Sequence, residues 1–416
     1  MKLTKVERSW VLYDVANSAF TLMATATIPI YFRSILAEGL LQPSEISRWL
    51  YIGTSVSTVV LAFASPILGA IGDYQGMKKR MFISFLLLGL VGGLTFTVTS
   101  NYVAFMLLYI MSQIGYSACN MFYDSMLTDV STDERMDSIS GYGYAFGYVG
   151  STIPFILGIT LIILSQKEMI PMSITLAMQI SFIITFIWWG AWSLPLIRNV
   201  HQTYYLPKQE HLIKTVFGRL SKLLAKMKKD KRLFYFVIAY FLYIEGVYTI
   251  ISSATTFGGE VGIDSIAMIL ALLLTQFVAF PFAILAGPLA KKFGSLNMIR
   301  FYILIYAFVC ILGYRLSTAT EFWILAVIVG LAQGGIQSLS RSYFGQIVPK
   351  NESNEHFGFL DIFGKFANLV GPAILTISTL IFDTSRPGIL FLIMFFVFGF
   401  ILVTKVARLD KKAKGN

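Results

Sequence analysis

Long apolar stretches separated by short polar segments recur along the whole chain. A helix needs about 20 apolar residues to cross the roughly 30 Å hydrocarbon layer of a membrane, and twelve stretches are long enough. Their approximate bounds are 10–34, 47–71, 81–99, 102–126, 139–164, 172–197, 234–257, 265–290, 298–314, 322–345, 357–381 and 387–405. The pattern predicts an all-α membrane protein with twelve transmembrane helices.

A loop signature occurs twice, about 220 residues apart, which indicates a duplicated half. The first copy, GAIGDYQGMKK, occupies residues 69–79, and a weaker copy, GPLAKKFGS, occupies residues 287–295. Each copy follows one long apolar run and precedes another. Parallel repeats of six membrane helices are a known transporter plan. We therefore predict two pseudo-symmetric six-helix bundles, at 1–197 and 234–416, joined by a basic linker at 198–233.

The composition excludes a water-soluble domain. Hydrophobic residues make up 56% of the chain, charged residues only 13%, and the mean hydropathy is +0.71. A soluble domain carries about 25% charged residues. The apolar stretches must therefore face lipid as well as one another.

The distribution of positive charge predicts the orientation, because cytoplasmic loops retain Lys and Arg. If both termini are cytoplasmic, 27 of the 33 Lys and Arg residues lie on that side. We expect a multi-pass protein of the plasma (inner) membrane with this topology. The net charge of +11 then reflects topology and contact with anionic lipid rather than nucleic-acid binding.

The linker has a pattern of its own between Glu210 and Arg232. Apolar residues recur every three or four positions there, with Lys and Arg between them. This spacing is typical of a basic amphipathic helix that lies on the inner leaflet. A regulatory or partner-binding helix is the functional alternative.

The chain offers no metal or enzyme signature. His201, His211 and His356 lack metal-ligand spacing, and we expect them to be solvated polar residues. No nucleophile–base arrangement is apparent either. We therefore expect no metal, no cofactor and no enzymatic activity.

The first copy of the loop signature has a physical interpretation. Gly69, Gly72 and Gly76 permit a tight turn and close helix approach. Asp73 adds a carboxylate at a helix end, beside the basic residues Lys78, Lys79 and Arg80. Such a group can form a latch, and a solvated turn is the simpler alternative.

This GxxxDxxGxK arrangement resembles the loop between helices two and three of the major facilitator superfamily. The resemblance implies an interdomain charge network that holds one access state. Four further stretches are similar to the vacuolar effluxer-like branch of this superfamily in its bacterial form, a branch related to autophagy-associated amino-acid effluxers of fungal vacuoles. They are WVLYDVANSAF at 10–20, SGYGYAFGYVG at 140–150, QGGIQSLSRSYFGQIVP at 333–349 and FGFLDIFGKFANLVGP at 357–372.

The chain departs from the branch at three positions. Val15 stands where bacterial relatives often have Trp, Asp124 where Asn is common, and Glu245 where Asp is common. The changes at Asp124 and Glu245 bear on proton or substrate chemistry.

Ionisable residues inside the membrane are candidate functional groups, since a charge at mid-bilayer costs about 2.5 to 3.5 kcal/mol on insertion scales. Asp14 lies about one turn into the first helix, where with Asn17 it forms either an interface-level cap or a cytoplasmic-side gate. Asp124, at the inner end of the fourth helix, is expected to join the Asp73 loop network. Arg341 has a similar depth in the tenth helix and is assigned to the gate, with snorkelling to the inner surface as the alternative.

Glu245 and Lys365 lie deeper. At 1.5 Å per residue Glu245 is about 16 Å along the seventh helix and Lys365 about 12 Å along the eleventh, so the two side chains can meet. Asp361, four positions before Lys365, is a competing partner. A structural ion pair is one interpretation, and a substrate or proton site is the other.

These observations predict a secondary transporter that works by alternating access. The resemblance implies export or exchange of amino acids or another small zwitterionic solute, with proton coupling left open. Lys365 would bind the solute's carboxylate and Glu245 its amine, while Gln333, Gln337 and Asn17 would orient it. A drug or amphiphile exporter is the alternative within transport, and a membrane receptor or scaffold that does not transport is the alternative outside it. We expect a monomer whose partners are the solute, the lipid bilayer and protons.

Overall fold

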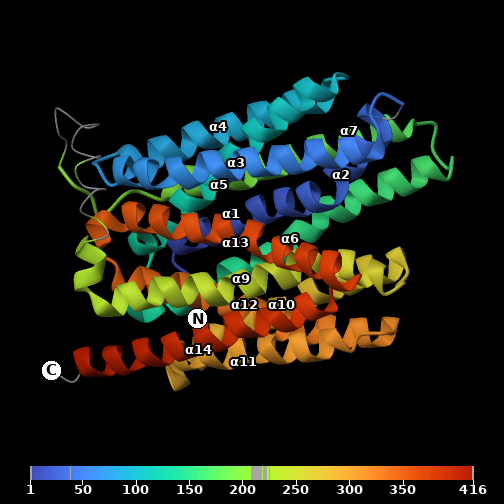
Figure 1. Ribbon diagram of the computed structural model, residues 1–416. Helices are drawn as coiled ribbons and strands as arrows, with labels where there is room; N and C mark the ends of the chain where they lie inside the picture. Colours follow the sequence, from blue (N-terminus) through green and yellow to red (C-terminus); the bar gives the residue numbers. More distant parts are fainter. Residues whose placement is uncertain (1, 38, 208–217, 219–222, 224, 415–416) are drawn as a thin grey trace.

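The computed structural model describes residues 2–37, 39–207, 218, 223 and 225–414, and these residues form long helices that run side by side (Figure 1). The first half contains α1 (Lys5–Leu22), η1 (Met23–Thr27), α2 (Ile28–Tyr31), η2 (Phe32–Leu36), α3 (Pro43–Gly72), α4 (Met77–Val98), α5 (Tyr102–Val130), α6 (Asp133–Gln166) and α7 (Ile174–Asn199). The second contains α9 (Lys231–Glu260), α10 (Ser265–Phe293), α11 (Ser295–Tyr314), α12 (Ala319–Ile347), η3 (Lys350–Glu352), α13 (Ser353–Phe382) and α14 (Arg386–Lys414).

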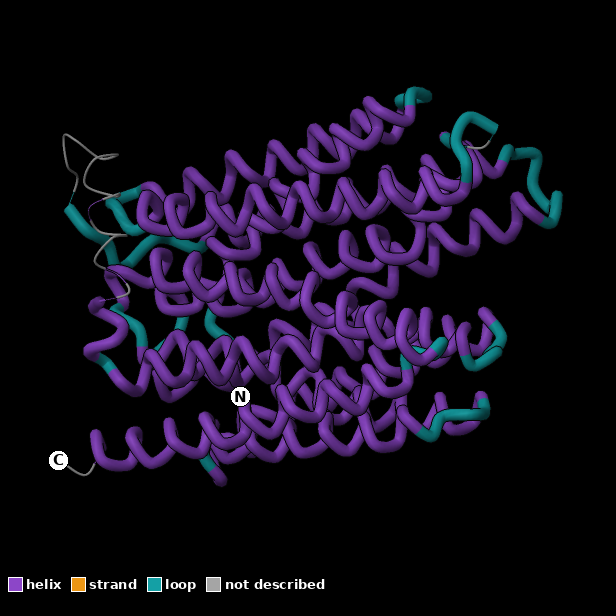
Figure 2. The backbone as a smooth tube through the Cα atoms, in the orientation of Figure 1, coloured by secondary structure: helices purple, strands orange, loops and turns teal. Residues whose placement is uncertain are grey.

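The prediction of an all-helical membrane fold is confirmed. Within the described residues, eleven helices are long and apolar enough to cross a membrane. The first predicted span, 10–34, lies within the succession of α1, η1, α2 and η2, which continues from Lys5 to Leu36 without a loop. Figure 2 shows how short the connections between the helices are.

The first span contains two wide π turns, on either side of α2. Pro29 lies between them and has no N–H to donate to the carbonyl four residues earlier. The wider turns accommodate that lost bond, and such turns are frequent at functional sites.

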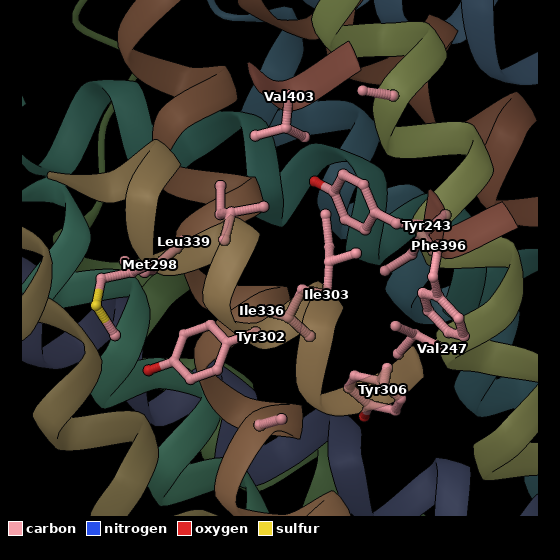
Figure 3. Close-up of a cluster of buried hydrophobic side chains, with 14 of the residues drawn as sticks. Tyr243, Val247, Met298, Tyr302, Ile303, Tyr306, Ile336, Leu339, Phe396 and Val403 are labelled. Atoms are coloured by element: carbon pink, nitrogen blue, oxygen red, sulfur yellow. The ribbon is translucent and has the colours of Figure 1, made fainter. Parts of the chain in front are cut away.

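The chain forms two bundles with separate cores. One core runs from Trp10 to Val200, and the other from Leu223 to Val406. In Figure 1 most of the blue-to-green helices lie above and most of the yellow-to-red helices below, with the orange-red α13 in the middle beside α1. Figure 3 shows the tight packing within the second core, where Ile303, Ile336 and Tyr243 come from three different helices.

The bundles meet mainly at α13 of the second bundle and at α6 of the first. α13 packs against α3 and also against α9 of its own bundle, and α6 packs against α10 and α12. A small shared core joins α6 to α10, with Ala145 and Tyr148 on one helix and Ala279 and Ala283 on the other.

We call the end of the molecule where α1 begins and α14 finishes the basic end. Ion pairs join the helix ends there. Arg135 pairs with Glu7, Lys350 with Asp133, and Arg232 with Asp410. The other end, which carries the α9–α10 and α11–α12 connections, is called the opposite end.

Most of the predicted amphipathic helix at 210–232 lies outside the described residues. Leu223 and Met227 are described and are buried in the core of the second bundle. Lys226 forms an ion pair with Glu352, at 3.1 Å.

Candidate functional site

Arg341 on α12 connects the second bundle to three helices of the first. Its guanidinium lies 3.2 Å from a carboxylate oxygen of Asp14 on α1 and 2.9 Å from one of Asp124 on α5. It also donates to the hydroxyl of Ser140 on α6 at 2.9 Å and to the Ser140 carbonyl at 3.1 Å. Its side chain is only 5% exposed, so the interpretation that Arg341 snorkels to the surface is wrong.

Aromatic rings surround this guanidinium. Its central carbon lies 4.7 Å from the ring centre of Trp10, 5.4 Å from that of Tyr123 and 4.3 Å from that of Tyr144, distances at which cation–π attraction operates. The Tyr123 hydroxyl donates to Asp14 at 2.6 Å. A side chain at Gly143 would collide with the Asp14 carboxylate, which explains the glycine there. We call Asp14, Asp124, Ser140 and Arg341 the seal.

Asp124 therefore belongs to the seal, and its expected place in the Asp73 loop network is wrong. The α5 helix turns its side chain toward Arg341 in the other bundle instead of toward the α3–α4 loop. Asn17 extends the hydrogen bonds of the seal, because its amide donates to Asp14 at 3.4 Å and to Asn120 at 3.0 Å.

The α3–α4 loop binds the start of α13 near the basic end. One carboxylate oxygen of Asp73 accepts hydrogen bonds from the Asn354 amide at 2.9 Å and the Asn354 side chain at 3.1 Å. The other accepts from the Glu355 amide at 3.3 Å. The first N–H groups of a helix have no partner within it, and the helix dipole favours an anion there. Asp73 thus caps a helix of the opposite bundle.

Lys78 has partners other than Asp73. Its ammonium lies 2.5 Å from Asp129 on α5 and 3.2 Å from the hydroxyl of Ser353 on α13. Lys79 is half-buried, and within the described part of the chain no ion pair involves it. The expected clustering of Asp73 with the lysines is thus replaced by two separate contacts with α13. We call Asp73, Lys78, Asp129 and the α13 start the latch.

The glycines of the loop have distinct roles. Gly76 adopts a positive φ of 73°, which lets the chain turn into α4. A side chain on Gly69 would lie 2.3 Å from the Asn354 carbonyl, so α3 and α13 approach closely only because this position is a glycine.

The segment after α7 forms hydrogen bonds with the latch, contacts that the sequence did not indicate. The Leu206 amide donates to the Asp73 carbonyl at 2.8 Å, and the Gln75 amide donates to the Leu206 carbonyl at 3.1 Å. The Asp129 carboxylate also accepts from the amides of Thr203 and Tyr204. Asp129 is thereby fixed on both of its oxygens.

The second copy of the loop signature lacks an aspartate, since Lys291 occupies the corresponding position. Asp137 on α6 of the first bundle supplies a carboxylate to this region. It accepts hydrogen bonds from Ser295 at the start of α11, at 2.6 Å, and from Ser342 and Gln346 on α12. The sequence analysis did not single out Asp137.

A group of half-buried polar side chains lies between the bundles; it begins at Asp124 of the seal and extends from there toward the opposite end. Asp361 accepts from Ser65 at 2.8 Å and pairs with Lys365 at 3.5 Å, and Gln337 accepts from the Tyr148 hydroxyl at 2.8 Å. We call this group the central polar layer. Its members are Tyr116, Asn120, Asp124, Tyr144, Tyr240, Tyr248, Gln337, Asp361 and Lys365.

Glu245 is not part of that layer. It is fully buried, and among the described residues neither carboxylate oxygen has a hydrogen-bond partner. Lys365 pairs with Asp361 instead, so the competing partner considered from the sequence is the one found. Gln333 is also buried, and it lines a cavity inside the second bundle.

The expectation of solvated histidines is wrong for His356. It is 2% exposed, and its ring nitrogen lies 2.8 Å from the Glu352 carbonyl in the first turn of α13. In the part of the chain that the structure describes, no three His, Cys, Asp or Glu residues gather as they would around a metal ion.

Comparison with known proteins identifies close relatives. The family model described as "Vacuole effluxer Atg22 like" matches residues 4–135 and 128–415. The uncharacterized MFS-type transporter YxiO of Bacillus subtilis is 42% identical over 408 residues, which cover 97% of this chain and 95% of YxiO. Autophagy-related protein 22 of Eremothecium gossypii is 24% identical over 410 residues, which cover 89% and 78% of the two chains.

Solved structures share the architecture. The human organic anion transporter MFSD10 (TETRAN) superimposes with a TM-score of 0.73 at 12% identity, over 96% of this chain and 99% of that one. The major facilitator superfamily transporter FucP, in the outward conformation, gives 0.70 at 16% identity, over 97% of each chain. At such low identity the likeness concerns the fold alone.

Proposed function

The chain belongs to the vacuole effluxer Atg22-like family of major facilitator superfamily transporters, and from this premise we propose that it is a secondary active transporter that works by alternating access. Its solute is an amino acid or another small zwitterion, which it exports or exchanges. It functions as a monomer in the plasma membrane, with the basic end in the cytoplasm.

The observation that carries the proposal is the position of the contacts between the bundles. Among the described residues, hydrogen bonds from one bundle to the other involve the seal, the latch and the Asp137 contacts. A few further bonds, such as those from Ser65 to Asp361 and from Tyr148 to Gln337, lie nearby. All of these lie in the half of the molecule nearer the basic end. A hydrogen bond to a charged group contributes about 1.5–3 kcal/mol, so these contacts stabilise one closed end. Transport requires a second state in which they separate.

The central polar layer has the charges that a zwitterion needs. Asp361 and Lys365 lie one turn apart on α13 and are both half-exposed. The Asp124 side chain is 34% exposed and close enough to Asp361 for the two carboxylates to interact. An ammonium group bound between Asp124 and Asp361 would relieve this repulsion, and the solute's carboxylate would bind Lys365. Gln337 and Asn120 supply hydrogen bonds.

This assignment replaces Glu245 as the ligand of the amine, because Glu245 is fully buried between α9 and α13. We assign Glu245 to proton coupling instead. A buried carboxylate without a partner is costly when charged. Whether Glu245 carries a proton therefore depends on how the surrounding helices pack against it.

Transport by purified protein in liposomes tests the proposal. Radiolabelled neutral amino acids, a nucleoside, a sugar and a lipophilic cation are compared, with and without an imposed pH gradient and against protein-free liposomes. We expect flux of a neutral amino acid, and we expect Lys365→Ala to weaken its binding. Glu245→Gln should abolish gradient-driven accumulation and spare counterflow.

A drug or amphiphile exporter is the second candidate, and the aromatic content of the central polar layer favours it. Tyr116, Tyr144, Tyr240 and Tyr248 all belong to the layer, and aromatic faces attract organic cations. Flux of the lipophilic cation alone would support this candidate. If no solute moves and a protein partner co-purifies, the chain acts as a receptor or scaffold.

A further inference from the structure

The second bundle contains a cavity that the substrate site does not use. It has a volume of about 110 Å³ and lies among α9, α10, α11, α12, α13 and α14. Its wall is mostly apolar but includes the polar side chains of Thr249, Ser253, Gln276 and Gln333. A site with several polar partners and room for more than one water molecule can be hydrated.

The cavity extends from the middle of the bundle toward the opposite end. Phe257 near the end of α9, Phe322 at the start of α12 and Leu316 in the α11–α12 connection all contribute to its wall. Thr249 lies at its inner limit, one helical turn from Glu245, and its hydroxyl donates to the Glu245 carbonyl at 2.7 Å. The cavity therefore extends from Thr249, one helical turn beyond Glu245, to the loops of the opposite end.

Glu245 has no exposed surface through which it could contact the central polar layer. Gly371 of α13 lies against the Thr249 side chain and leaves no room there for a Cβ atom. Tyr248, which lies on α9 like Glu245, is half-buried and lies near the charged groups of the layer. Glu245, in contrast, has no exposed surface. In this conformation Glu245 therefore has no direct path to the solute.

A second unsatisfied polar atom marks the same region. The Tyr306 hydroxyl is buried and, among the described residues, has no hydrogen-bond partner. Tyr306 stacks on Phe396 with ring centres 5.8 Å apart, and Figure 3 shows both side chains beside Val247. Buried polar groups in native proteins are almost always paired with protein or water. Val309 and Cys310, within one turn of Tyr306 on α11, line the cavity.

We propose that the cavity of the second bundle is the hydrated route by which Glu245 receives its proton from the opposite end, apart from the path taken by the solute. This inference rests on the proposed function. A proton passes from a hydronium ion in the cavity, beside Thr249, to a Glu245 carboxylate oxygen, and a neutral carboxyl and a water molecule result. The conformation described here, with the basic end closed, is the proton-loaded state.

A filling variant tests the route. Leu272 on α10 lines the cavity, whereas Leu270 on the same helix is 47% exposed and does not. Leu272→Trp should reduce pH-gradient-driven flux by about tenfold, equivalent to about 1.4 kcal/mol in the barrier, while counterflow stays close to that of the unmodified protein. Leu270→Trp is the matched control and should change neither rate.

Thiol labelling reports the water content of the cavity directly. Cys310 lines the cavity, and Cys119 is buried in the core of the first bundle. A small charged methanethiosulfonate reagent should modify Cys310 and spare Cys119, as measured by intact-protein mass spectrometry. Leu272→Trp should protect Cys310 and Leu270→Trp should not.

The outcomes separate the route from the proposed function. If Leu272→Trp protects Cys310 and yet retains full gradient-driven flux, while Glu245→Gln loses it, the route is wrong and coupling through Glu245 stands. If Cys310 resists the reagent in the unmodified protein, the cavity does not open to the solution at the opposite end and the route is also wrong. If Glu245→Gln keeps gradient-driven flux, the coupling itself is refuted.

Discussion

At the scale of single residues, Arg341 depends on the two bundles being together. Its positive charge is balanced by Asp14 and Asp124 of the other bundle, and its faces contact aromatic rings. Breaking a buried ion pair by removing one partner is costly, because the remaining charge is left without compensation.

Arg341→Gln should therefore destabilise the protein by about 3–5 kcal/mol, seen as a lower unfolding temperature in detergent. The triple variant Arg341→Gln, Asp14→Asn, Asp124→Asn removes the whole charge set and should recover most of that loss. A single variant as stable as the unmodified protein would contradict the seal as described.

Glu7 offers a residue-scale test that depends on pH. Burial alone would raise its pKa, but hydrogen bonds from Arg135 and Thr4 together lower the pKa below the usual 4.5. A carboxylate with a lowered pKa stabilises the folded state above its unfolded pKa, and this contribution is lost as the pH falls through the folded value.

Glu7→Gln should thus lower the unfolding temperature at neutral pH, and the difference from the unmodified protein should shrink as the pH falls below 4.5. Thermal scans of both proteins across this pH range check it. A difference that is constant with pH would mean that charge is not the cause.

At the scale of elements, the start of α13 is stabilised by the other bundle. Asp264 provides a matched comparison, because it accepts from the Ala267 amide at the start of α10, within its own bundle. Asp73→Ala and Asp264→Ala each remove a helix cap, at a cost of about 0.5–2 kcal/mol. Only the Asp73 variant loosens one bundle from the other.

Labelling of Gly364→Cys, on the same face of α13 as Asp361 and Lys365, reports the difference. With Cys119 and Cys310 replaced by Ser, we expect Asp73→Ala to speed the reaction of this thiol with a reagent applied at the basic end. Asp264→Ala should leave that rate unchanged. Equal rates in the two variants would remove the latch from the mechanism.

Much of the element-scale architecture was predictable from sequence, because apolar length and loop polarity determine where membrane helices begin and end. The twelve predicted spans agree with the helices to within a few residues at most ends. The two π turns of the first span were missed, since Pro29 alone does not reveal how its lost hydrogen bond is accommodated.

The partners in the candidate site were less predictable. Asp73 binds backbone amides of α13, which leave no trace in the sequence. Asp137 and Asp129 lie in ordinary helical sequence, and their roles depend on which residues face them across a bundle. Arg341 was assigned to the gate from the sequence. Whether its side chain points to the other bundle or to the membrane surface depends on how α12 is rotated, which the sequence does not show.

At the scale of the whole molecule, one end is closed by contacts on both sides of the bundle interface. The latch joins α3 to α13, and Asp137 joins α6 to α11 and α12. The two copies of the loop signature thus act at related places, and a conformational change must release both.

The orientation of the molecule is a separate prediction. With both native cysteines replaced by Ser, a thiol at Lys228 should resist an impermeant maleimide in intact cells, and one at Ser100 should react. Both positions are exposed, so poor access would not explain a difference. The reverse pattern would place the basic end outside.

Distances between spin labels measured by double electron–electron resonance test alternating access most directly. One pair, Gln75→Cys with Asn351→Cys, spans the bundles at the basic end, and another, Ser100→Cys with Ser317→Cys, spans them at the opposite end; all four positions are exposed. On addition of a transported solute or on a rise in pH, we predict that the first distance increases while the second decreases. Two distances that stay constant while the protein transports, or that increase together, would contradict the account.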